Sequence, residues 1–199
     1  NLRAEKESTI DAAATDASAG GANMFAGAFV AEQMPKLEGL VGKYTFQGSM
    51  IMAPGTPEMK ITGKETVAMG FGRSVLVMHT KGDRVGGMGD HAYEAYAFMA
   101  YDETRQCFVA ASVTNMGEVH QSEWRLHDED TLLGTMAAKM QGKYTVGRTT
   151  LELDDSGAMA SIVSETMAVA DKPVVSFRGS YAKQESLVAE TEVAASGAP

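Results

Sequence analysis

Cysteine is nearly absent from this chain. Its 199 residues include only Cys107, which excludes an intrachain disulfide and a metal site built from paired cysteines. Cys107 lies in an apolar strand segment, which indicates a buried thiol rather than a nucleophile. Aromatic residues are also few, at 7% of the chain, so small residues and methionine must fill much of the core. The 14 methionines suit either plain core packing or an irregular, ligand-accepting interior.

Basic residues are scarce as well. The chain has 17 Lys and Arg against 26 Asp and Glu, a net charge of -9. Without clusters of Lys and Arg, neither nucleic acid nor an anionic membrane surface is an expected partner. No stretch approaches the roughly 20 apolar residues of a membrane-spanning helix. Because the chain begins with Asn1 rather than Met, a processed, targeted or exported protein is one expectation, and its compartment is left open.

The sequence contains no familiar catalytic motif. It has no GxSxG nucleophile elbow, no HExxH zinc motif and no P-loop. The glycine-rich segments at 70–72 and 86–89 lack the strand-to-helix context of a phosphate loop, so we interpret both as turns. The four histidines are dispersed, at His79, His91, His120 and His127. We therefore predict no bound metal and no cofactor.

A regular series of short strands separated by turn signals fills the middle of the chain. The pattern predicts about ten strands, at residues 41–53, 58–69, 73–81, 91–101, 106–114, 118–126, 131–140, 143–153, 158–167 and 174–183. The clearest turns are Asn115-Met116-Gly117 and Asp154-Asp155-Ser156-Gly157.

These short connections predict an all-β fold in which neighbouring strands pair antiparallel. Closure into an up-and-down barrel removes both free edges, so we favour a barrel over a Greek-key sandwich. The expected division is an N-terminal extension at 1–36, the barrel domain at 37–183 and a C-terminal tail at 184–199. One or two helical turns are expected over 24–33, ending at Pro35.

The segment 118–126 separates two kinds of face, because side chains alternate along a strand. One face carries Glu118, His120 and Trp124, while the other looks solvated. We therefore expect the first face to point inward. Polar groups inside a barrel indicate a wet or ligand-filled interior. The alternatives are a satisfied core or rim histidine at His120 and a loop-edge charge at Glu118.

Three hypotheses for function follow. The first is a barrel that binds a small apolar or amphipathic ligand, lined by Tyr44, His79, Tyr96, Glu118, His120, Trp124 and Met136. The second is an assembly subunit whose segments 1–36 and 184–199 fold on a protein partner, with Phe25, Phe29 and Val30 as anchors. The third is an enzyme in which Glu118 and His120 form an acid–base pair.

Several short motifs resemble a known family. They are the opening Leu40-Val41-Gly42-Lys43-Tyr44, then Gly63-Lys64-Glu65-Thr66, Tyr101-Asp102, Asp154-Asp155-Ser156-Gly157 and Tyr181. Together with the methionine content, they are similar to an uncharacterised bacterial family of calycin-like barrels, domain of unknown function 1579. The resemblance covers roughly 37–183 and implies a lipocalin-like fold without an agreed activity. Tyr44 stands where the family usually has Trp. Related heme-binding barrels use a late histidine, and this chain has none after His127, so heme is not expected.

Overall fold

The structure, a computed structural model, describes residues 31–51, 56–83, 92–140, 143–167 and 174–185. Among these residues no helix has the length and apolar character needed to cross a membrane. The described elements are η1 (Met34–Leu40), β1 (Gly42–Met50), β2 (Met59–Gly70), η2 (Phe71–Arg73), β3 (Val75–Gly82), β4 (Glu94–Asp102), β5 (Cys107–Thr114), β6 (Val119–Leu126), β7 (Thr131–Met140), β8 (Lys143–Leu153), β9 (Met159–Met167) and β10 (Val174–Lys183).

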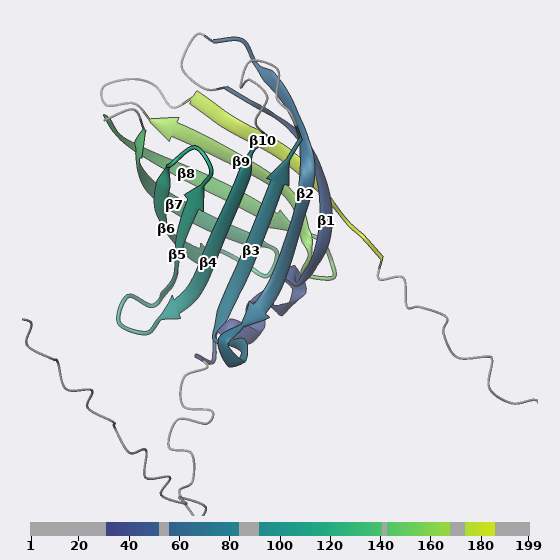
Figure 1. The fold of residues 1–199 in the computed structure, drawn as a ribbon. Coiled ribbons are helices and arrows are strands. Elements are labelled where there is room, and N and C mark those ends of the chain that lie inside the picture. Colours follow the sequence, from purple (N-terminus) through teal and green to yellow (C-terminus); the bar gives the residue numbers. More distant parts are fainter. Residues whose placement is uncertain (1–30, 52–55, 84–91, 141–142, 168–173, 186–199) are drawn as a thin grey trace, which may run out of the picture.

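The ten strands form one closed antiparallel barrel (Figure 1). Each strand pairs with its neighbours in sequence, and β1 closes the ring by pairing with β10 over residues 44–50. Closure leaves no strand edge free to pair with another chain. This arrangement confirms the predicted all-β, up-and-down barrel.

Turn chemistry ends the strands where the sequence predicted it. The Asp154 carboxylate accepts hydrogen bonds from the backbone N–H groups of Ser156 at 2.9 Å and Ala158 at 3.0 Å. These bonds and one from the Ser156 hydroxyl hold the pKa of Asp154 below its ordinary value. Gly157 then adopts a φ of +75°, which glycine tolerates best. At the predicted 115–117 hairpin, Gly117 has a φ of +78°.

Alternation along β2 shows how the sequence separates the inside of the barrel from the outside. Ile61, Gly63, Glu65 and Val67 are buried, while the residues between them are exposed. The strand register extends the assignment of inner and outer positions to the other strands, since directly paired residues share a face. Glu65 pairs with Thr80 on β3, and Thr80 pairs with Ala95 on β4. Cys107, as expected, is a buried free thiol.

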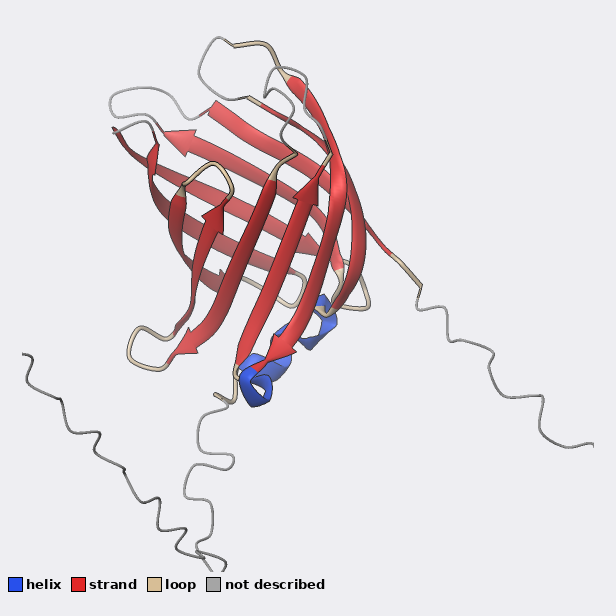
Figure 2. Ribbon diagram, in the orientation of Figure 1, coloured by secondary structure: helices blue, strands red, loops and turns tan. Residues whose placement is uncertain are grey.

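The helix η1 lies at one end of the barrel (Figure 2). Its buried side chains build a hydrophobic floor there. Its Met34 and Leu37 are fully buried. The floor is the cluster of Met34, Leu37, Leu40, Tyr44, Val67, Leu76, Met99, Phe108, Leu132, Leu151 and Met159. Its apolar area is withdrawn from water, which stabilises the fold at about 25 cal/mol per Å².

Side chains and backbone also tie η1 to the barrel. Arg73 forms an ion pair with Glu38, and Lys183 donates a hydrogen bond to the Gly39 carbonyl at 3.0 Å. A Cβ on Gly39 would lie 2.6 Å from the Gly157 carbonyl oxygen, so only glycine permits this approach.

This helix corrects one expectation. We expected Pro35 to end a helical segment, but it stands in the first turn of η1, where its missing N–H costs no hydrogen bond. Consequently η1 spans the boundary expected between residues 36 and 37. Most of the helical segment expected over 24–33 lies outside the described residues, as do the proposed anchors Phe25, Phe29 and Val30.

Candidate functional site

The inner face of β6 carries the polar side chains that the sequence indicated. His120 pairs with Ser112 on β5, and Trp124 pairs with the buried Phe108. Met136 on β7 pairs with Ser122, so it lies on the same inner face. The register therefore brings four predicted residues together inside the barrel: Glu118, His120, Trp124 and Met136.

Glu118 and His120 lie close enough to interact. The Nε2 atom of His120 is 3.5 Å from Oε2 of Glu118. Within the described chain, that nitrogen is buried yet has no hydrogen-bond partner. The side chains nevertheless keep 20% and 24% of their surfaces exposed, respectively. Burying a polar nitrogen without a hydrogen bond costs free energy. The His120 nitrogen therefore indicates a position where a bound molecule or water supplies the missing hydrogen bond.

Trp124 is held in a fixed place on the inner face. Its indole N–H donates to the Ser122 hydroxyl at 2.8 Å. Its ring lies over Gly134 on β7, where an added Cβ would come within 2.8 Å of three ring atoms. Glycine at this position is what lets the ring lie flat against the barrel wall.

We predict that Gly134→Ala displaces the Trp124 ring. The added methyl overpacks the site, with an expected cost of about 1–3 kcal/mol in the free energy of unfolding. Because Trp124 is the only tryptophan, its fluorescence emission reports this movement directly. The exposed Thr135→Ala on the same strand is the control. Unchanged emission in Gly134→Ala would contradict the described packing.

Glu65 on β2 is a second inward carboxyl, which the sequence analysis did not select as a site residue. It is 7% exposed and accepts a hydrogen bond from the Thr80 hydroxyl at 3.1 Å. Burial raises the pKa of Glu65, and hydrogen bonds from Thr80 and Tyr181 oppose that rise. The available signal was its position, because Glu65 alternates with Ile61, Gly63 and Val67 on one face of the strand.

The charges of the Glu65 and Glu118 carboxyls affect the pKa values of two tyrosines. Burial raises the pKa of Tyr93 to about 12, with smaller contributions from the negative charges of Glu118 and Glu65. Burial likewise raises the pKa of Tyr181, followed by the charge of Glu65. Tyr93 therefore lies within electrostatic reach of both inner carboxyls.

The interior beyond the floor has two unlike walls. An apolar wall on β1, β2 and β10 consists of Phe46, Ile61, Met50, Met59 and Phe177. A polar wall consists of Ser112 on β5, Glu118 just before β6, and His120 and Ser122 on β6. In the closed ring, β6 lies five strands from β1 in either direction, so the walls face each other. We call this part of the barrel interior the chamber.

Three predicted lining residues lie elsewhere. Tyr44 points inward but is fully buried in the floor, and its hydroxyl donates to the Leu40 carbonyl at 2.8 Å. His79 and Tyr96 pair with each other on the outer face, so the expectation that they line the interior is corrected. Their rings stack there with centroids 4.1 Å apart.

His79 was misplaced because β3 is apolar on both faces. Leu76 and Met78 point inward, while Val75 and Val77 share the outer face with His79. A hydrogen bond of 2.7 Å from His79 to Glu94 lowers the pKa of that carboxyl. The contacts of His79 with Tyr96 and Glu94 therefore lie on the outer surface and do not line the chamber.

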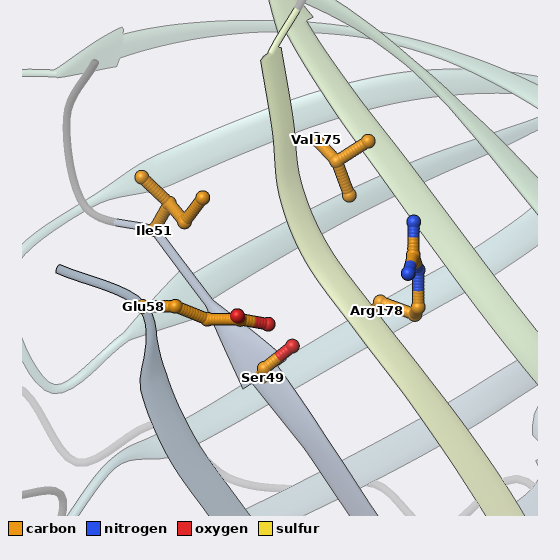
Figure 3. Close-up of a pocket in the computed structure, with 5 residues that line it drawn as sticks. All are labelled: Ser49, Ile51, Glu58, Val175 and Arg178. Carbon is orange, nitrogen blue, oxygen red and sulfur yellow. The ribbon is translucent and has the colours of Figure 1, made fainter. Parts of the chain in front are cut away.

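A small cavity of about 210 Å³ also opens on the outer face of the barrel, beside β1 and β10 (Figure 3). It is lined by Ser49, Ile51, Glu58, Val175 and Arg178. Glu58 and Arg178 are exposed to solvent there, which makes this a wet surface depression. No group of three or more metal-binding side chains is arranged to hold an ion within the described parts of the chain.

Comparison with known proteins agrees with this fold. A family model described as "Protein of unknown function (DUF1579)" matches residues 32–172. The crystal structure of Rv2717c from M. tuberculosis is similar, with a TM-score of 0.55 and 12% sequence identity. The match covers 78% of this chain and 99% of that one, and at this identity it shows the fold alone. Among curated proteins, none matches this sequence.

Proposed function

This chain belongs to the DUF1579 family of proteins of unknown function, and we propose that it binds a small amphipathic molecule in its chamber. The observation that carries the proposal is the partial exposure of Glu118 and His120. Both side chains lie on the inner face, yet they keep 20% and 24% of their surfaces exposed. A solidly packed interior would leave no such surface, and it would not bury polar groups without partners.

The two walls match the two ends of an amphipathic molecule. Phe46, Ile61 and Phe177 offer apolar surface on one side. The Ser112 hydroxyl and the Glu118–His120 pair offer hydrogen-bonding groups on the other. Small-molecule sites in proteins combine largely apolar lining with a few placed polar groups in this way.

The position of Trp124 gives the proposal a direct test. Purified protein is titrated with the neutral fluorophore N-phenyl-1-naphthylamine while Trp124 emission is followed. We expect saturable binding that quenches Trp124, because a probe in the chamber lies close to this ring. Native mass spectrometry should then show one probe per chain. Binding that neither saturates nor affects Trp124 would contradict the proposal.

The Glu118–His120 pair also has the geometry expected of a general base and its orienting partner. A general base acts only on a substrate proton within its reach, so a molecule must first bind in the chamber. Binding is therefore the more direct hypothesis, and the probe titration addresses it first.

A further inference from the structure

The chamber holds inner carboxyls that pair with no Lys or Arg among the described residues. Its described ionisable walls carry the carboxyls of Glu65 and Glu118, together with His120. By register, two basic residues of the described strands also belong to the inner face, Lys143 at the start of β8 and Lys183 near the end of β10. Lys183 has inner-face register, but it lies exposed at the floor end, where it donates to Gly39.

Within the described parts of the chain, Glu65 is a buried carboxyl without a cationic partner. It is 7% exposed, and the contacts of its oxygens are hydroxyl groups, those of Thr80 and Tyr181. Buried carboxylates in proteins are normally paired with a cation or a metal. A hydroxyl satisfies the hydrogen bond but leaves the charge uncompensated. The missing counter-charge points to a group that the ligand itself brings.

Glu118 gives independent support from the other side of the chamber. Its carboxylate is partly exposed inside the barrel, and its neighbour His120 has a buried nitrogen with no hydrogen bond. Both carboxyls act electrostatically on Tyr93, which lies before β4, between β2 and β6 in the ring. Aromatic rings such as those of Tyr93 and Tyr181 are themselves favourable neighbours for an ammonium group.

We infer that the chamber prefers an amphipathic cation, an alkyl or aryl amine whose ammonium group is accepted by Glu65 and Glu118 and whose apolar part packs on Phe46, Ile61 and Phe177. This inference rests on the proposed function, because it names the class of ligand for the same chamber. An ammonium group brings a positive charge that no Lys or Arg among the described residues supplies to either carboxyl. A carboxylate ligand would instead meet uncompensated like charge.

Three probes with one tail and different heads test the preference. Decylamine, decanol and decanoate, below their micelle concentrations and at neutral pH, compete with N-phenyl-1-naphthylamine. We expect decylamine to displace the probe with at least about tenfold higher affinity than decanol, a factor equal to 1.4 kcal/mol, and decanoate to be the weakest. Equal affinities, or decanoate as the tightest ligand, overturn the inference.

Paired variants locate the effect. Glu118→Gln and Glu65→Gln should each lower decylamine affinity severalfold and leave decanol affinity unchanged. Glu103→Gln removes the same charge from an exposed turn and should change neither. An amine preference that survives both inner substitutions contradicts the assignment to these carboxyls. If the fluorophore itself fails to bind the wild-type chain, the proposed function fails and the inference fails with it.

Discussion

Replacing Leu37 with alanine is expected to lower the free energy of unfolding by about 2–5 kcal/mol, the usual cost of a large-to-small change in a core. Leu37 is fully buried in the floor, where its side chain packs η1 against the strand residues of the same hydrophobic cluster. A helix of seven residues has little stability of its own, so it depends on these contacts. Urea denaturation measures the loss.

Lys36→Ala is the matched control for this experiment. It truncates the neighbouring side chain of the same helix, which is exposed. Surface changes of this kind usually stay within about 0.5 kcal/mol. If Leu37→Ala loses no more stability than Lys36→Ala, η1 does not close the barrel as described.

Replacing Glu65 with glutamine is expected to stabilise the barrel at neutral pH. Burial raises the pKa of Glu65 in the folded protein above its ordinary value. The folded state then holds a proton that the unfolded state releases, so stability is complete below the unfolded pKa and is lost as pH rises through the folded pKa. Glutamine keeps an acceptor for Thr80 and Tyr181 without the charge.

The measurement is the melting temperature of both proteins from acid to neutral pH. We expect Glu65→Gln to melt a few degrees higher at neutral pH, since 1 kcal/mol shifts the melting temperature of a domain this size by about 2–4 °C. The gap should close in acid, below the ordinary Glu pKa. Glu103→Gln serves as the control for the change in net charge. A lower melting temperature for Glu65→Gln at neutral pH would contradict the described burial.

Much of the barrel was predictable from the sequence because turn signals and two-residue alternation are local. The predicted strands 131–140, 143–153 and 174–183 match β7, β8 and β10 to the residue. Asp154 and Gly157 mark their turn through side-chain capping and positive φ. The floor helix was not predictable in this way, because η1 is short and its Pro35 suits either the end of one helix or the start of another.

The candidate site was predictable only where one face of a strand differed clearly from the other. On β6 the alternation placed Glu118, His120 and Trp124 together, and the register agrees. On β3 apolar residues occupy both faces, so alternation did not determine where His79 points. The lack of a cationic partner for Glu65 could not be predicted from the sequence. It depends on which residues of β1, β3 and β10 surround Glu65 in the closed barrel. The docking role of Phe25, Phe29 and Val30 stays a prediction.

Filling the chamber tests the central claim most directly, and neighbouring residues on β5 offer a matched pair. Ser112 lies on the inner face beside His120, whereas Ala111 is exposed on the outer face. Ser112→Phe and Ala111→Phe each add a benzyl-sized group at almost the same height on the barrel. Binding of N-phenyl-1-naphthylamine is measured for both variants below their melting temperatures. We expect Ser112→Phe to abolish saturable binding and Ala111→Phe to bind as the wild type does. Undiminished binding by a folded Ser112→Phe barrel, or equal losses in both variants, would show that the ligand site is not the chamber.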